Sequence, residues 1–221
     1  MKNRKYGPKL WRLAIYVCGL SLLALGSTIN LKTGLGVACI TASAASLSIA
    51  TGWNLSVWIF LIYSVMITVQ ILILGRGKWW TVLLQMTVNV AFSLFLEWFG
   101  KLFDFHFEAL WQNLLLMAVA PLVLGAGLCL MVNMQMPPNP PDGLVYTVSE
   151  AYGKDMGLVK NIVDAIFVAV AVTVDLLTSG HLNTVGIGTA FSMIFNGRAV
   201  ALLNPILRPR LLKLAGLTER T

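Results

Sequence analysis

The chain has 221 residues, of which 57% are apolar and only 11% are charged, and its mean hydropathy is +0.79. A soluble domain carries roughly a quarter charged residues, so this composition excludes an ordinary soluble protein and predicts an integral membrane protein. The net charge of +7 does not indicate nucleic-acid binding, because the basic residues lie at the termini and in short loops between apolar runs. We therefore expect the lipid bilayer as a partner, and no nucleic acid.

The apolar runs predict an all-α polytopic membrane protein with six transmembrane helices. A helix needs about 20 apolar residues to cross the hydrocarbon core. The first run follows a basic tail and resembles a secretory signal, but it is long enough to be a retained helix. The six predicted spans cover residues 13–30, 55–74, 82–98, 109–132, 158–177 and 185–207. Two further segments, 38–52 and 141–153, are too short or too polar for spans.

The basic residues orient the predicted spans. With six spans and a cytoplasmic N-terminus, only Lys32 and Lys101 fall in outer loops, and Arg198 lies within a span. An arrangement of eight spans gives a weaker bias, because it moves the basic loop at 76–78 to the outside. Both arrangements place both termini in the cytoplasm.

An internal repeat divides the chain. The stretch "TGLGVACITASAASLSIATG" lines up with "MPPNPPDGLVYTVSEAYG", so that Gly52 falls on Gly153 and Thr41 on Asp142. Each half then has three crossings and one short broken or re-entrant helix, and an odd number of crossings turns the halves in opposite directions. This inverted repeat is typical of secondary transporters; eight spans would instead give parallel repeats. The predicted order is a basic tail (1–12), first repeat (13–100), external loop (101–108), second repeat (109–207) and basic tail (208–221).

The stretch "PPNPPDGL", residues 137–144, cannot be helix interior, because each proline lacks an N–H and clashes with the preceding turn. Irregular backbone is tolerated at membrane depth only where protein or water covers its polar groups. We expect a short half-helix here, with Asp142 near its N-cap and Thr41 in the equivalent position of the first half. The alternative is a rigid cytoplasmic turn before a surface helix.

Two ionisable residues lie clearly inside predicted spans, Asp164 and Arg198. Both lie roughly 10 Å deep, and packing of consecutive antiparallel helices would bring them level. We predict a salt bridge, or a shared water or ligand, between them. Lys160 is the competing partner, since it precedes Asp164 by one helical turn. The predicted substrate-binding or coupling residues are therefore Thr41, Asp142, Lys160, Asp164 and Arg198, although the charge pair could instead fix only how the last helices pack.

No combination of residues predicts catalysis. No nucleophile has a base at a plausible spacing, and the three cysteines and two histidines are too scattered for a metal site. We therefore expect no enzyme, no metal and no cofactor. The glycines of "TVGIGTAF", residues 184–191, favour close helix contact or a flexible helix start over a dinucleotide site, because no strand precedes them. Gln70, Gln85 and Asn89 are placed to hydrogen-bond across helices.

The motifs "QILILGRGKWWTVLLQ" and "PDGLVYTVSEAYGKDMGLVKNIVD" resemble the YczE/YitT-like family of uncharacterised bacterial integral membrane proteins, over residues 19–207. The chain departs from that pattern at "GVACITASAAS", which lacks a proline. The resemblance implies a multi-pass protein of the bacterial cytoplasmic (inner) membrane and supplies no substrate.

Our leading hypothesis is an inner-membrane transporter of a small polar or anionic solute, with proton coupling through Asp164. The rival is a non-transporting scaffold or regulatory protein with a dry interior. A channel would need a continuous water-lined path, which the scarcity of polar residues on the spans disfavours. A homo-oligomer stays open.

Overall fold

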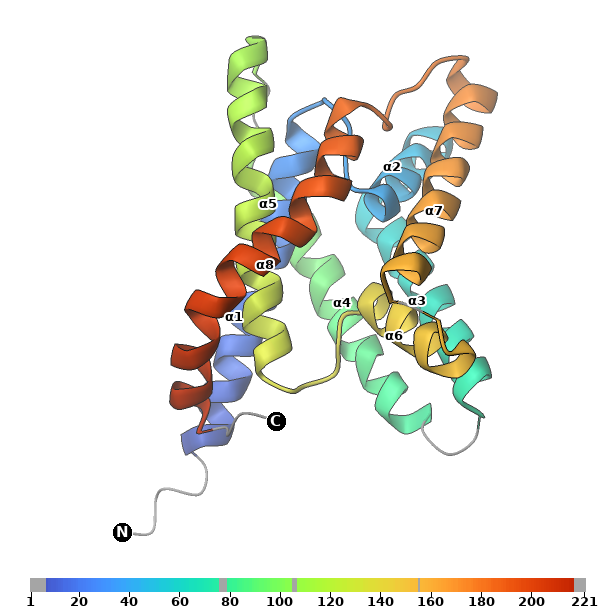
Figure 1. The fold of residues 1–221 in the computed structure, drawn as a ribbon. Coiled ribbons are helices and arrows are strands. Elements are labelled where there is room, and N and C mark those ends of the chain that lie inside the picture. The colour runs from blue at the N-terminus through green and yellow to red at the C-terminus, as the bar shows by residue number, and fades with distance from the viewer. Residues whose placement is uncertain (1–6, 76–78, 105–106, 155, 217–221) are drawn as a thin grey trace.

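The computed structural model describes residues 7–75, 79–104, 107–154 and 156–216. These residues form a helical bundle without strands (Figure 1), which confirms the predicted all-α class. The long helices are α1 (Gly7–Lys32), α3 (Leu55–Leu74), α4 (Trp79–Leu102), α5 (Leu110–Asn133), α7 (Met156–Ser179) and α8 (Ile187–Ala215). The short helices are α2 (Cys39–Thr51) and α6 (Pro140–Tyr152). The basic residues at 1–6, 76–78 and 217–221 and His106 lie outside the described residues.

The six long helices are long and apolar enough to cross a membrane, which confirms the six predicted spans. Large apolar side chains cover their outer faces; Leu72, Leu177 and Ile187 are 76%, 82% and 77% exposed. The last span is predicted to end near residue 207, and the helix α8 continues beyond it to Ala215. Its two internal prolines each remove one backbone hydrogen bond, but their fixed φ is compatible with a helix.

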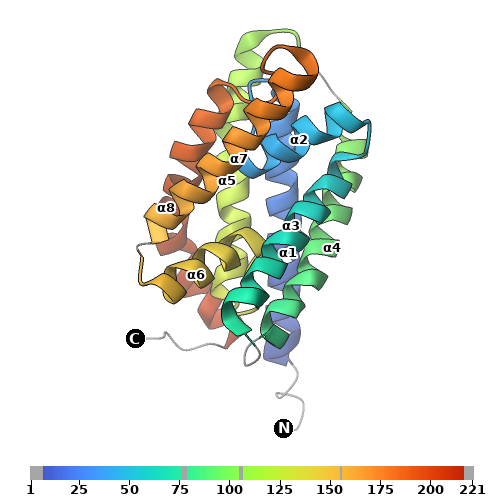
Figure 2. The same cartoon turned by 90° about the vertical axis from the view of Figure 1, so that its right-hand side faces the viewer.

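The two short helices do not cross the bundle. Each has 13 residues, or about 20 Å at 1.5 Å per residue, whereas the hydrocarbon core is about 30 Å thick. We call the end of the bundle with the start of α1 and the end of α8 the terminal end, and the opposite end the far end. Figures 1 and 2 show α2 toward the far end and α6 toward the terminal end.

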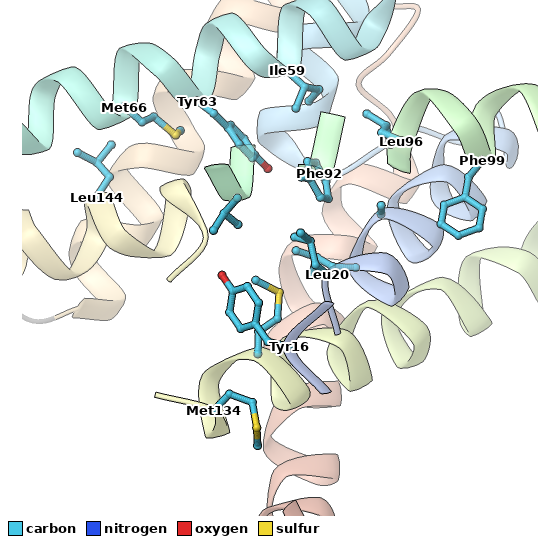
Figure 3. Close-up of a cluster of buried hydrophobic side chains, with 14 of the residues drawn as sticks. Tyr16, Leu20, Ile59, Tyr63, Met66, Phe92, Leu96, Phe99, Met134 and Leu144 are labelled. Carbon is cyan, nitrogen blue, oxygen red and sulfur yellow. The ribbon is translucent and has the colours of Figure 1, made fainter. Parts of the chain in front are cut away.

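The apolar core lies between α1, α3, α4, α5 and α6 (Figure 3). Tyr63 of α3 stacks on Phe92 of α4, with ring centroids 5.6 Å apart. Ile59 and Met66 are almost fully buried on the same face of α3. This core fixes α3 and α4 beside each other.

Polar side chains connect α3, α4 and α6, as predicted for Gln70, Gln85 and Asn89. The amides of Gln70 and Gln85 form two reciprocal hydrogen bonds of 3.2 and 2.9 Å. Gln70 Nε2 also donates to the carbonyl oxygen of Pro140 at 3.2 Å. Asn89 Nδ2 donates to the carbonyl oxygen of Phe60 at 3.0 Å. The glutamine pair therefore holds the start of α6 against α3 and α4.

The glycines at the start of α8 provide a close contact, which is one of the two readings of this stretch in the sequence. Gly188 N–H donates to the carbonyl oxygen of Leu35 at 2.7 Å, so the loop before α2 lies against the start of α8. A Cβ added at Gly188 would lie 2.4 Å from the carbonyl oxygen of Gly36. Only glycine leaves room for the two backbones at this distance.

The helices do not all pack against their neighbours in the chain. Close contacts join α1 to α4 and α5, α2 to α7, α3 to α4 and α6, and α5 to α8. By contrast, α7 and α8 diverge from their connecting loop and do not pack along each other (Figure 1). The two halves thus differ in how their last two helices are arranged.

Candidate functional site

A cavity of about 200 Å³ is lined by residues at the starts of α2 and α6 and by residues of all the other helices. Leu23, Phe92 and Leu124 form part of its apolar wall. The polar side chains that line it are those of Ser27, Thr41, Tyr63, Asn139, Asp142, Lys160 and Asn196. Three of the five predicted site residues, Thr41, Asp142 and Lys160, therefore meet at one cavity.

The start of α2 brings free backbone donors to the cavity. Ala38 is the N-cap, and its methyl side chain cannot accept a hydrogen bond. The first three N–H groups of a helix have no partner within it, and Cys39, Ile40 and Thr41 occupy these positions. The preceding loop is held in place where Val37 N–H donates to the carbonyl oxygen of Thr184 at 3.3 Å.

Asp142 lies near the N-cap of α6, as predicted. Asn139 is the N-cap and Pro140 and Pro141 are the first two helical residues, so Asp142 is the third helical residue rather than the cap. Proline is favoured at the first helical position, where a missing N–H costs nothing, and this moves the cap back to Asn139. Thr41 is likewise the third residue of α2, so Thr41 and Asp142 remain equivalent.

The loop before α6 is fixed by side chains of α1. Arg12 Nη2 donates to the carbonyl oxygen of Met134 at 2.7 Å, and the Tyr16 hydroxyl donates to that of Pro137 at 2.7 Å. The start of α6 is therefore held from both sides, by α1 through this loop and by the glutamine pair through Pro140.

The buried carboxylate of Asp164 pairs with Lys160, whose Nζ lies 2.6 Å from both carboxylate oxygens. The predicted salt bridge between Asp164 and Arg198 is wrong. Arg198 is exposed, does not line the cavity, and has its guanidinium 5.7 Å from the ring centroid of Phe195. The prediction assumed that α7 and α8 pack side by side, and they do not.

Two acceptors at the start of α6 lack partners. Asn139 is only 7% exposed, and its Oδ1 accepts no hydrogen bond from any described residue. Asp142 is partly buried and forms no ion pair with the residues that the structure describes. Buried polar atoms are nearly always hydrogen-bonded in native proteins, so an unpartnered one beside a cavity indicates a ligand or water there.

Sequence reasoning missed four polar residues of the wall: Ser27, Tyr63, Asn139 and Asn196. Asn139 lies within the proline-rich stretch, where the rule that proline occupies the first helical position would have identified it as the cap. Tyr63 precedes Asp164 by the same interval that separates Thr41 from Asp142 in the repeat alignment. Ser27 and Asn196 carry no comparable signal, since small polar residues are common on spans that pack together.

The halves of the chain correspond in local detail. Gly52 and Gly153 both end their short helices in a left-handed conformation, and their N–H groups bond to Ser48 and Ser149. Gly153 follows Gly52, and Ser149 follows Ser48, by the same number of residues. Several pairs of cavity residues share this interval: Leu23 and Leu124, Ser27 and Leu128, Ala38 and Asn139, Ile40 and Pro141, and Thr41 and Asp142.

The contact between α1 and α5 is reciprocal. A Cβ added at Gly26 would lie 2.7 Å from the backbone nitrogen of Leu124, and one added at Gly127 would lie 2.6 Å from that of Leu23. Gly127 and Leu124 follow Gly26 and Leu23 by the same interval. Reciprocal contacts of this kind are a property of two units related by a two-fold axis.

Comparison with known proteins gives a family but no activity. No curated protein and no solved structure matches the chain. A family model does match, and its match over residues 10–205 includes the whole cavity wall and nearly all of both halves. The resemblance to the YczE/YitT-like proteins remains a prediction. The chain belongs to DUF6198, a family of unknown function.

Proposed function

We propose that the chain is a membrane transporter that binds a small polar solute in this cavity and carries it across by alternating access. The observation that carries this proposal is the meeting of two half-helix starts at one cavity that seven polar side chains line. Secondary transporters bind their solutes at such sites. A scaffold acting only through helix packing would have a dry, apolar interior, and the seven polar side chains that line the cavity argue against this.

The proposal includes an inverted repeat, in which residues 13–100 and 109–207 are related by a two-fold axis in the membrane plane. Three observations support it. The short helices lie toward opposite ends of the bundle, the contact between α1 and α5 is reciprocal, and equivalent residues line the cavity. The axis would pass through the cavity, so that each half contributes one half-helix to the solute site.

Alternating access follows from the difference between the halves. In the proposed repeat, α3 and α4 are equivalent to α7 and α8, yet only α3 and α4 pack along each other. If the halves exchange arrangements, α8 closes on α7 while α4 separates from α3. The cavity would then open toward the end of the bundle opposite to the one that it faces in this structure.

We propose that Asp164 couples proton movement to transport. In this state Lys160 neutralises Asp164 within hydrogen-bond distance, and Lys160 also lines the cavity. Movement of Lys160 toward the solute would leave Asp164 buried and unpaired, which favours its protonation. Uptake should then respond to an imposed pH gradient, and Asp164→Asn should remove that response.

The proposed location is a bacterial inner membrane, with the terminal end in the cytoplasm. Basic side chains lie near the terminal end on α1 and α8, among them Lys9, Arg208 and Lys213. At the far end, Lys32 pairs with Asp104 at 3.5 Å and Lys101 with Glu97 at 2.7 Å. This distribution agrees with the positive-inside rule. A homo-oligomer also stays a proposal, which the mass of the purified protein in lipid would test.

The function is tested first by ligand-dependent thermal stabilisation of the purified protein, and then by uptake of the stabilising solutes into proteoliposomes. We expect Asp142→Asn and Lys160→Met to reduce uptake at least tenfold. Arg198→Ala should retain uptake, because Arg198 lies outside the cavity wall. If the folded cavity variants transport as well as the wild type, or if only Arg198→Ala is inactive, the site assignment is refuted.

A further inference from the structure

We propose that the solute is a small zwitterion, with a protonated amine at one end and a carboxylate at the other. This inference rests on the proposed function, because it names the substrate class of the same cavity. It is drawn from a chemical difference between the two half-helix starts, which are equivalent in position but opposite in hydrogen-bonding character.

The start of α6 is an acceptor end. Pro140 and Pro141 have no N–H, so the first two donors of this helix are absent. Asp142 adds a carboxylate at the third position, and Asn139 adds a buried oxygen without a partner. A protonated amine supplies both the positive charge and the hydrogen-bond donors that these groups lack.

The start of α2 is a donor end. It has no acidic residue in its first turn and no proline, and the N–H groups of Ile40 and Thr41, both of which line the cavity, have no partner within the helix. No described backbone oxygen accepts from them, whereas the next N–H, that of Ala42, bonds to Ala38. Such a helix start favours an anionic group through its N–H groups and its dipole.

Lys160 does not reverse this polarity, because Asp164 neutralises it. A simple anion would face the carboxylate of Asp142, which forms no ion pair with any described residue, and a simple amine would leave the donors of α2 without an acceptor. A zwitterion satisfies both ends at once. The volume of about 200 Å³ limits its size, since cavities for drug-sized ligands measure roughly 300–1,000 Å³.

The test uses full-length protein in lipid nanodiscs and matched probes on the same carbon skeletons. The zwitterions are alanine, β-alanine and 4-aminobutyrate. The probes that lack the amine are propionate and butyrate, those that lack the carboxylate are ethylamine and propylamine, and glycerol is the neutral probe. We expect at least one zwitterion to raise the melting temperature, and each of its two matched fragments to bind at least tenfold more weakly.

Two variants test which helix start binds the amine of the solute and which binds its carboxylate. Asp142→Asn should weaken zwitterion binding at least tenfold and should not weaken propionate binding. Glu150→Gln, which alters an exposed carboxylate on the same helix outside the cavity wall, should change neither. Ile40→Pro copies the equivalent Pro141, removes one donor from α2 and should weaken zwitterion binding while leaving amine binding unchanged.

The inference is overturned if the carboxylates, the amines or glycerol bind as tightly as the zwitterions, or if no zwitterion binds. It is also overturned if Asp142→Asn and Glu150→Gln behave alike. Binding of another class that the cavity variants abolish would leave the proposed transport function standing. Uptake that no cavity variant alters would refute the proposed function itself.

Discussion

Gly143 leaves room for the glutamine pair at the start of α6. A Cβ added there would lie 2.7 Å from Gln85 Nε2 and 2.8 Å from Gln70 Oε1. Both amides are buried and bonded to each other, so they cannot withdraw without losing hydrogen bonds. Gly143→Ala should therefore destabilise the protein by about 1–3 kcal/mol, measured as a lower melting temperature in detergent.

Gly100→Ala is the matched control for this prediction. Gly100 also lies in a helix, but nothing is within 4 Å of a Cβ added there, and alanine is the better helix former. This variant should melt at or above the wild-type temperature. Equal melting temperatures for Gly143→Ala and the wild type would contradict the close contact between α6 and the glutamine pair.

The glutamine pair itself gives a second prediction at this scale. Gln70→Leu would leave Gln85 and the Pro140 carbonyl oxygen without a donor. Unpaired buried polar groups cost about 1–3 kcal/mol each, although hydrogen bonds within membranes average nearer 0.6 kcal/mol. We expect Gln70→Leu to lower the melting temperature more than Thr68→Leu, since Thr68 is exposed and bonds only within its own helix.

At the scale of elements, the α1–α5 contact makes a prediction about symmetry. Gly26→Ala and Gly127→Ala would each bring a methyl group within 3 Å of backbone atoms of the other helix, and backbone cannot move aside as a side chain can. Because the two contacts are equivalent, the two variants should lower the melting temperature by similar amounts. A large loss from one variant and none from the other would argue against the reciprocal contact.

The sequence predicts the helices better than it predicts which helices pack against each other. Apolar runs of the right length identify all six spans, and the short length or the polarity of residues 38–52 and 141–153 identifies α2 and α6 as helices that do not cross. Hydropathy does not tell which helix lies beside which, because lipid and helix both accept an apolar face. The predicted bridge from Asp164 to Arg198 was wrong for this reason, while the local pair of Lys160 and Asp164 needed only helical spacing.

The candidate site was predictable only in part. Thr41 and Asp142 were found through the repeat and Lys160 through its spacing from Asp164, and all three line the cavity. The cavity itself was not predictable, because its shape depends on how far α8 stands from α7.

For the whole molecule, the orientation has a direct readout. A fluorescent reporter fused after α8 should fold and fluoresce in the cytoplasm, and a periplasmic reporter inserted in the loop between α4 and α5 should be active outside. The same pair of reporters exchanged between the two positions serves as the control. Activity in the exchanged positions would place the terminal end outside the cell.

The central claim is that the cavity opens to each side of the membrane in turn, and cysteine accessibility measures this without knowledge of the solute. The native cysteines are Cys18, Cys39 and Cys129 and would first be replaced by alanine. Ser27→Cys then places a thiol at the cavity wall, and Ala44→Cys places one at a fully buried position on α2 as the control. A small membrane-impermeant thiol reagent should label the Ser27→Cys protein from the outside of cells and also in inside-out vesicles, and should label the control from neither side. Labelling of the Ser27→Cys protein from one side alone, or from neither, would contradict the account.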